Sequence, residues 1–143
     1  MPYSEVLITP MREDLSRHGV LETRTPADVD RVISENETVL MVTNSICGCA
    51  AGKARPAVVL AMQNVVRPDV AATVFAGADV EAVAHLRERH LHGVAPSSPS
   101  MALFRGGKLV WALHRFQIES GTAPEIAGTL KMAFAEHCEQ QPA

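Results

Sequence analysis

Val39-Leu40-Met41-Val42-Thr43-Asn44-Ser45-Ile46-Cys47-Gly48-Cys49 is the stretch of this sequence that decides the fold. Its first four residues are apolar without alternation, which is typical of a strand covered on both faces of a sheet. The alanines that follow, Ala50 and Ala51, begin a helical segment. Reactive groups gather at the carboxyl ends of strands in parallel sheets, so the cysteines at this strand-to-helix junction are the first candidates for chemistry.

Further helices are indicated by a hydroxyl N-cap with a proline in the first turn. This signature occurs at Thr9-Pro10, at Thr25-Pro26 and at Thr122-Ala123-Pro124-Glu125. Together with apolar periodicity it predicts helices at about residues 10–18, 26–35, 50–66, 79–91 and 123–138. The last helix carries an apolar stripe at i+4 steps, which faces a core: Ile126, Leu130, Phe134 and Cys138.

Strands are expected at residues 39–42 and 73–75, with a hairpin formed by residues 101–104 and 109–113. The segment Arg105-Gly106-Gly107-Lys108 supplies the hairpin turn. Alternation of strand and helix in the first part and a hairpin in the second predict an α/β fold. Its central mixed sheet has helices on both faces. A chain of 143 residues is the size of one domain, so we expect a single domain over residues 1–143.

Composition excludes several classes of function. Hydrophobic residues make up 47% of the chain and charged residues 20%, as in a globular protein. A net charge of −3 and an aromatic content of 4% argue against nucleic acid as a partner. The longest uncharged stretch, residues 38–52, is too short to span a membrane, and the first fifteen residues lack an apolar leader. We therefore expect a cytoplasmic protein.

The cysteines point to redox or metal chemistry. There are 3, an odd number, and two are separated only by Gly48, which differs from the even set of a secreted disulfide scaffold. The helix N-terminus favours the thiolate form of Cys47, which is the nucleophile of disulfide exchange. Lys53 and Arg55 could add positive charge near this thiolate, or they could form a solvated face of the helix. Cys49 is placed to resolve a mixed disulfide, and Gly48 suits the small ring of a Cys47–Cys49 disulfide.

Three blocks of the sequence resemble the bacilliredoxin family of thioredoxin-like proteins, over about residues 3–138. They are Thr43 to Gly52 with Ala54-Arg55-Pro56-Ala57, then Pro96 to Leu103, and finally Ala133 to Cys138. The resemblance implies a thioredoxin-like fold with Cys47 and Cys49 as the redox pair. It also implies that Pro99 is a cis-proline facing that pair, so that the Ser98 backbone can dock an extended substrate.

The activity implied by this resemblance is removal of bacillithiol from mixed disulfides on cytoplasmic proteins. The partners are then bacillithiolated or disulfide-containing proteins, with bacillithiol as a low-molecular-weight co-substrate and no other cofactor. The sequence also departs from familiar patterns. Ile46 stands where thioredoxins carry tryptophan, Met41 replaces their buried carboxylate, and His114-Arg115-Phe116 replaces the usual Pro-Arg-His of the family.

Alternatives remain open from the residues alone. The same chemistry would suit a general disulfide reductase or isomerase. A Cys-Gly-Cys pair could also carry a metal or cluster if a second subunit supplied further ligands. Whether the protein forms a homodimer is left open. Asn44 either binds near the substrate or satisfies the end of the strand. Cys138 is expected to be a core residue. No metal site is expected, because helical spacing does not place His85, His90 and His92 on one face.

Overall fold

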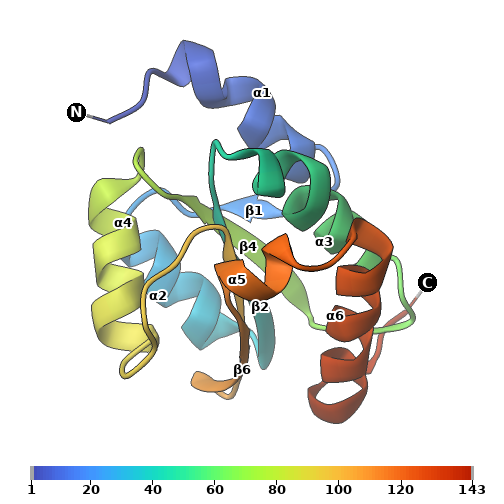
Figure 1. The fold of residues 1–143 in the computed structure, drawn as a ribbon. Helices are drawn as coiled ribbons and strands as arrows, with labels where there is room; N and C mark the ends of the chain where they lie inside the picture. The colour runs from blue at the N-terminus through green and yellow to red at the C-terminus, as the bar shows by residue number, and fades with distance from the viewer. Residues whose placement is uncertain (1, 143) are drawn as a thin grey trace.

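The computed structural model describes residues 2–142, so the expected domain limits, residues 1 and 143, fall outside the described range (Figure 1). The helical segments are α1 (Glu5–Ser16), α2 (Pro26–Glu35), η1 (Ala50–Ala54), α3 (Arg55–Ala61), α4 (Val80–His85), η2 (Leu86–His90), α5 (Arg115–Glu119) and α6 (Ala123–His137), where η marks a π-helix. The strands are β1 (Leu21–Glu22), β2 (Thr38–Asn44), β3 (Val66–Arg67), β4 (Val70–Phe75), β5 (Ser100–Arg105), β6 (Lys108–Leu113) and β7 (Glu139–Gln140).

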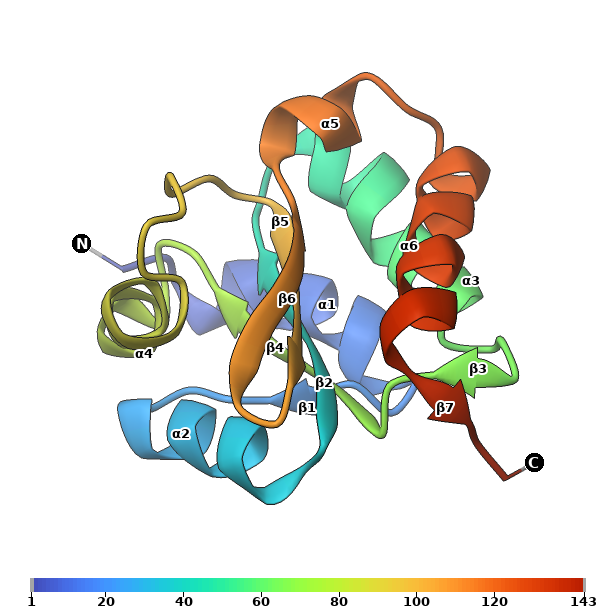
Figure 2. The same cartoon turned by 90° about the horizontal axis from the view of Figure 1, so that it is seen from below.

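The main sheet has five strands in the order β1-β4-β2-β5-β6. Strands β1 and β2 lie parallel to β4, whereas β5 pairs antiparallel with β2 and β6 antiparallel with β5. Helices α3 and α6 cover one face, and α2 and α4 cover the other (Figure 2). The predicted α/β fold, with a mixed sheet between helical layers, is confirmed.

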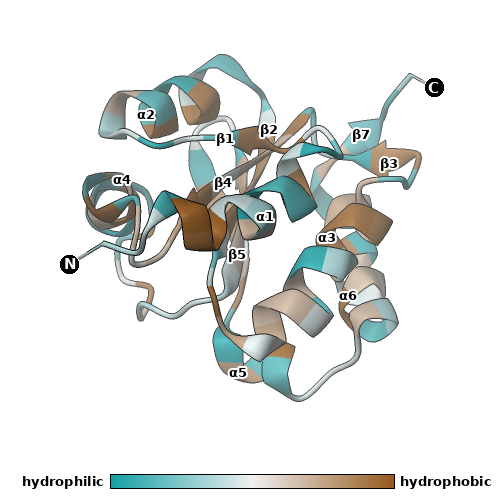
Figure 3. Ribbon diagram, turned by 90° about the horizontal axis from the view of Figure 1, so that it is seen from above, coloured by the Kyte–Doolittle hydropathy of each residue, from teal (hydrophilic) through white to brown (hydrophobic). Residues whose placement is uncertain are grey.

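Strand β2 is the middle of this sheet and is buried along its whole length. Its side chains alternate between two cores. Leu40 and Val42 pack beneath α3 and α6, while Val39 and Met41 pack beneath α2 and α4. A strand buried on both faces has no polar face, which explains the uninterrupted apolar run in the sequence. In Figure 3 the outer helices α2 and α4 show both hydrophilic and hydrophobic colour, as amphipathic helices do.

Two predicted helices agree closely with the structure. Helix α2 begins at Pro26 and ends at Glu35, and the Thr25 hydroxyl accepts a hydrogen bond of 3.1 Å from the Asp28 N–H. At α6, the Thr122 hydroxyl and the Glu125 carboxylate cap each other's backbone N–H groups. Such reciprocal capping is legible in the sequence because it depends only on residues three apart.

The first predicted helix begins in the wrong place. Residues 10–18 were expected with Thr9 as the cap, but α1 starts at Glu5 and the Ser4 hydroxyl caps it through the Val6 N–H. Pro10 therefore lies inside the helix. A proline there removes the hydrogen bond to the carbonyl of Val6. Val6 is 89% exposed, so water can satisfy that carbonyl.

The predicted helix over residues 50–66 is shorter and of two kinds. It starts with the π-helical turn η1, continues as α3 and ends at Ala61. Pro56 sits in the first turn of α3. Because proline cannot donate to the carbonyl four residues back, the turn before it loses its regular bond, and a wider turn is a known way to accommodate this. The helix therefore changes type just before Pro56.

The remaining elements follow the expected order. Strand β4 contains the predicted residues 73–75 and starts at Val70. The hairpin β5–β6 turns at Gly106 and Gly107, whose φ angles of 59° and 78° belong to the left-handed region that glycine tolerates. Among residues 2–142, the helices are all too short or too polar to cross a membrane.

Candidate active site

The cysteine pair and the loop before β5 meet at the carboxyl end of β2. Cys47 and Cys49 follow that strand directly. In the antiparallel pairing of β2 with β5, Thr43 stands opposite Ser100, so continuing the register places Pro99 at the end of β2, where the cysteine segment begins. The Ser98–Pro99 peptide bond is cis, as the resemblance implied.

Cys47 is half-buried and its sulfur is surrounded by hydrogen-bond donors. Burial alone raises the pKa of the Cys47 thiol. Hydrogen bonds from the Cys49 thiol, the Ala50 N–H and the Ser45 hydroxyl outweigh burial, so the pKa lies below that of an ordinary cysteine. The Ser45 hydroxyl oxygen accepts the Cys47 N–H at 3.2 Å, which leaves its hydrogen free for the sulfur. Cys47 is therefore the thiol that ionises first.

Cys49 shows the opposite shift. Burial raises the pKa of its thiol, and the hydrogen bond that it donates to Cys47 and the negative charge of that thiolate raise it further. Arg115 lowers the pKa of Cys49, and Glu119 raises it. The Cys47 thiol therefore loses its proton before the Cys49 thiol does.

This asymmetry orders the two steps of disulfide exchange. Cys47 attacks as a thiolate and loses its charge when it enters a mixed disulfide. The charge that raised the pKa of Cys49 is then gone, so Cys49 ionises more readily and attacks the Cys47 sulfur. Cys49 becomes a nucleophile only after capture, which supports Cys47 as the attacking residue and Cys49 as the resolving one.

Arg115, at the start of α5, is the cation beside the two sulfurs. Its hydrogen bond of 2.7 Å to Glu119 raises the pKa of its guanidinium, and the negative charge of the cysteine pair raises it further. Its Nη1 donates to the Ser98 carbonyl at 3.1 Å, and its backbone N–H donates to the Ser97 hydroxyl at 3.2 Å. Arg115 thus links the cis-proline loop to the cysteine pair.

Arg115 is not among the site residues predicted from the sequence. A signal existed in the segment His114-Arg115-Phe116, where the arginine matches the family pattern although its neighbours do not. Nothing in the spacing showed that a residue so far along the chain would face the cysteines. Only the antiparallel β5–β6 hairpin brings the start of α5 back to the end of β2.

Lys53 and Arg55, proposed as cations near the thiols, point elsewhere. The Lys53 ammonium donates to the Glu119 carbonyl. Arg55 is 4% exposed, so it belongs to no solvated face. Its guanidinium donates to Asp14 at 3.1 Å and to the Ser45 carbonyl at 2.9 Å, and so it supports the active-site segment from beneath.

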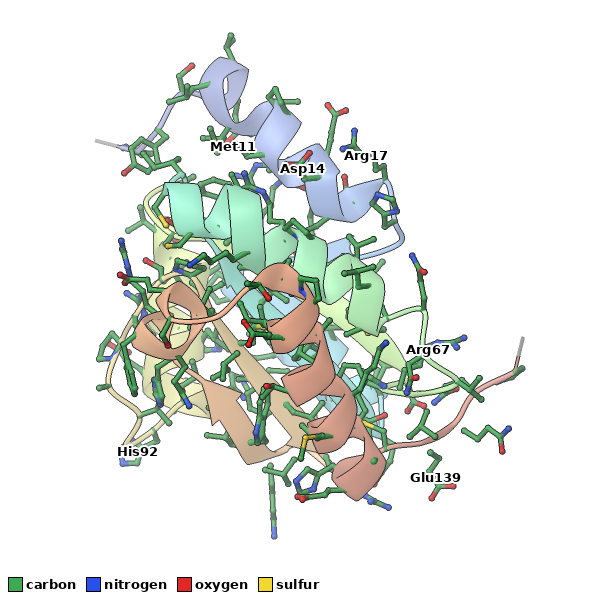
Figure 4. All side chains as sticks on the ribbon, turned by 45° about the vertical axis from the view of Figure 1, so that its right-hand side comes forward. Met11, Asp14, Arg17, Arg67, His92 and Glu139 are labelled. Carbon is green, nitrogen blue, oxygen red and sulfur yellow. The ribbon has the colours of Figure 1, made fainter. Side chains whose placement is uncertain are left out.

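Asn44, a candidate for substrate binding, is 1% exposed and bonded within the chain. Its Oδ1 accepts from the Ser45 N–H at 2.8 Å and from Arg55 at 3.0 Å, and its Nδ2 donates to the Met11 carbonyl at 3.2 Å. Of the two roles considered, satisfying the strand end fits this placement. Figure 4 labels Met11 and Asp14 on α1, the helix to which Asn44 and Arg55 tie the active-site segment.

Gly48 lies between the cysteines with space around it. Its φ is not in the left-handed region, and an added Cβ would meet nothing within 4 Å. In the dithiol form, therefore, the backbone does not demand glycine here. The expectation that Gly48 serves the small ring concerns the Cys47–Cys49 disulfide, and for that form it stays a prediction.

Cys138 is a half-buried thiol at the end of α6 that packs against the larger core. Burial and the nearby Asp69 carboxylate raise its pKa to about 11, although Thr38 and Arg105 oppose the shift. A thiol with that pKa is almost entirely protonated at neutral pH. This environment supports the expected structural role.

The three thiols are expected to react with iodoacetamide in a fixed order. At pH 7 Cys47 is alkylated first, because its pKa is lowered, Cys49 follows, and Cys138 reacts only in unfolded protein. Peptide mass spectrometry after timed quenching measures the order. Labelling of Cys49 before Cys47 would contradict the assigned roles.

A half-buried cysteine pair of opposite pKa shifts, beside a cis-proline at the end of a central strand, defines a thiol–disulfide oxidoreductase. The fold is that of thioredoxins. The solution structure of oxidised thioredoxin from Plasmodium falciparum matches with a TM-score of 0.60 and 19% identity, over 85% of this chain and 100% of that one. Fasciola hepatica thioredoxin gives 0.58 and 20%, over 82% and 99%. At these identities the likeness confirms the thioredoxin-like fold alone.

Sequence comparison then gives the family. A family model described as disulphide isomerase matches residues 3–138. A bacilliredoxin from Salinibacter ruber is 46% identical over 140 residues, which are 96% of this chain and 81% of that protein. One from Halalkalibacterium halodurans is 45% identical over 138 residues, 96% and 95% of the two chains. The chain belongs to the bacilliredoxin family, and the resemblance found in the sequence is confirmed.

Proposed function

We propose that this thiol–disulfide oxidoreductase removes bacillithiol from mixed disulfides on proteins. The observation that carries the proposal is the opposite pKa shift of Cys47 and Cys49, which suits capture of a thiol by one sulfur and its release by the other. The name bacilliredoxin of the relatives supports bacillithiol as the thiol that is carried.

The steps balance as two thiol–disulfide exchanges. The Cys47 thiolate attacks the bacillithiol sulfur, forms a Cys47–bacillithiol disulfide and releases the protein thiolate. The Cys49 thiolate then attacks the Cys47 sulfur, so that bacillithiol leaves as a thiolate and a Cys47–Cys49 disulfide forms. Two electrons from a dithiol reductase or from two further low-molecular-weight thiols restore the enzyme. A cytoplasmic location is proposed with this cycle, because a reducing compartment keeps both thiols reduced.

Ser98 is proposed as the backbone group that docks the substrate chain. Its carbonyl already accepts a hydrogen bond from Arg115, so an extended segment would pair with the Ser98 N–H. The carbonyl, one of the two Ser98 backbone groups that could pair with a substrate, is therefore already bonded within the chain. The buried ring of Pro99 forms the wall beside it.

The test compares two caps on one protein. A substrate with a single cysteine is prepared as its bacillithiol mixed disulfide and, as a matched control, as its cysteine mixed disulfide. Faster release of bacillithiol than of cysteine supports the proposal. Equal rates would show that the cap is not recognised.

A general disulfide isomerase is the second candidate, favoured by the description of the matching family model. Recovery of activity by a scrambled disulfide protein measures this function. Fast refolding together with slow cap removal would favour it over the first proposal. A metal or cluster carrier has less support, because the only cluster of three or more potential ligands found among residues 2–142 does not include the cysteines.

Arg115→Gln is expected to slow the resolving step. Arg115 lowers the pKa of Cys49, so its removal raises that pKa and leaves less thiolate at pH 7. The guanidinium is exposed, so we expect a slowing of about two- to fivefold. The effect should fade as pH rises above the pKa of Cys49, which a pH profile of bacillithiol release measures. Arg115→Lys, which keeps the charge, serves as the control.

A further inference from the structure

Three metal-ligating side chains meet on the face of the sheet covered by α2 and α4. The Nε2 atoms of His85 and His90 each lie 2.7 Å from the same oxygen, Oδ1 of Asp30. One donor atom from each side chain lies within 4.8 Å of the other two. The disulfide chemistry at Cys47 and Cys49 uses none of these groups.

The two histidines converge because the helix widens between them. In a regular α-helix, residues five apart point about 140° away from each other. Here α4 passes into the π-helical turn η2, where the Leu91 N–H bonds to the Leu86 carbonyl at 2.9 Å. The wider turn brings the His85 and His90 rings to a centroid distance of 5.8 Å. π-Helical turns frequently accompany functional sites.

The expectation of no metal site assumed regular helical spacing, and the π-helical turn changes which residues share a face. His92, the third histidine of that segment, lies beyond the turn and is exposed at the periphery in Figure 4. The third ligand comes instead from Asp30 of α2, the neighbouring helix on the same face. Sequence spacing could not show this partner.

The fold buries most of the two imidazoles and leaves the carboxylate more exposed. The side chains of His85 and His90 are 23% and 17% exposed, against 54% for Asp30. His90 packs edge-on against Phe104, a buried residue of β5, at 6.1 Å. Zinc binds imidazole nitrogen at about 2.0–2.1 Å, so an ion would enter between the rings as the carboxylate shifts outward. The more exposed Asp30 has the freedom to do so.

We propose that Asp30, His85 and His90 bind a divalent transition-metal ion of the zinc class. Two imidazoles with one carboxylate suit zinc and its neighbours, whereas calcium and magnesium prefer oxygen ligands throughout. Three protein ligands leave a fourth position for water. The ion would join α2 to the end of η2, and the loop that leaves η2 at Leu91 carries Ser98 and Pro99 to the active site.

Zinc titration of the Cys47→Ser/Cys49→Ser protein against a chromogenic chelator tests the proposal without the two active-site thiols. We expect one zinc ion per chain. His85→Gln and His90→Gln should each weaken zinc affinity by at least about tenfold. His92→Gln is the matched control, and it should bind zinc as tightly as the parent, the Cys47→Ser/Cys49→Ser protein with all its histidines. Asp30→Asn changes the third ligand. Thermal unfolding without zinc checks that each of these variants is folded.

Two measurements make the outcome decisive. Zinc should raise the unfolding temperature of the parent and of His92→Gln, and at the same zinc concentration it should raise that of His85→Gln less. Cobalt bound in place of zinc should give visible absorption without a thiolate charge-transfer band. No bound zinc, or unchanged affinity in both His85→Gln and His90→Gln, would overturn the site. Neither result would bear on the proposed removal of bacillithiol.

Discussion

Cys47→Ser is expected to abolish release of bacillithiol from a capped protein, with a loss of at least about 10³-fold. A serine hydroxyl is not ionised at neutral pH and cannot form the mixed disulfide that the first step requires. The donors around position 47 would remain, but they would have no thiolate to stabilise. Timed release of bacillithiol from the capped substrate, followed by mass spectrometry, measures the loss.

Cys49→Ser should fail at the second step instead. The Cys47 thiolate still attacks and releases the substrate protein, and bacillithiol then stays on Cys47. Mass spectrometry of this variant after one turnover is expected to find the adduct on Cys47. The first step should persist, because a serine hydroxyl at this position can still donate a hydrogen bond to the Cys47 sulfur, as the Cys49 thiol does. Cys138→Ser, which changes a thiol of pKa about 11, is the matched control and should keep full activity.

The pair of variants separates the roles of the two sulfurs. If Cys47→Ser retained activity while Cys49→Ser lost the first step, Cys49 would be the attacking residue and the account of their pKa shifts would be wrong. If both variants failed to release the substrate protein, the resolving thiol would be needed for capture as well. Only an adduct trapped on Cys47 agrees with the order proposed here.

The fold was predictable where its signals are local. Caps at Thr25 and Thr122, and the double glycine of the hairpin, depend on residues a few positions apart, and the structure confirms them. Thr9-Pro10 carried the same signature yet lies inside α1, because the Ser4 hydroxyl caps the helix earlier. The π-helical turns η1 and η2 were not predicted, since the widening of a turn by one residue leaves the apolar pattern almost unchanged.

The active site was predictable as far as its motif reaches. Cys47, Cys49 and the cis form of Pro99 followed from the residues and the family resemblance. The groups around them come from distant parts of the chain. Arg115 lies near the cysteines only because the hairpin brings the start of α5 back to the end of β2. Arg55 points inward because its guanidinium donates a hydrogen bond to Asp14 of α1. The sequence shows that both side chains carry a positive charge. The direction in which each one points depends on partners that are distant in the sequence.

Helix α1, which supports the active-site segment, is fastened by a buried ion pair. Arg12 and Asp79 have side chains only 5% and 6% exposed, and two hydrogen bonds of 2.7 and 3.0 Å join them. Glu5 adds two more bonds to the same guanidinium, at 3.0 and 3.1 Å. Asp79 also accepts the Phe75 N–H at 2.9 Å, at the end of β4. The pair therefore joins α1 to the sheet.

Arg12→Met is expected to lower the free energy of unfolding by about 3–5 kcal/mol, because it leaves the Asp79 carboxylate buried without its partner. A loss of that size is a large share of the about 5–15 kcal/mol that stabilises a typical domain. Urea unfolding followed by circular dichroism measures it. The matched control is Arg31→Met, which removes an exposed arginine paired with Asp28 and should cost less than about 1 kcal/mol.

The two variants remove the same length of side chain, so the difference between their losses measures the buried, hydrogen-bonded network of Arg12 as a whole. Equal losses in Arg12→Met and Arg31→Met would mean that water reaches Asp79 once Arg12 is gone. Because Met11 and Asp14 of the same helix bind Asn44 and Arg55 behind the cysteines, a loosened α1 should also disturb the donors around Cys47. In folded Arg12→Met protein, alkylation of Cys47 should then require a higher pH than in the parent.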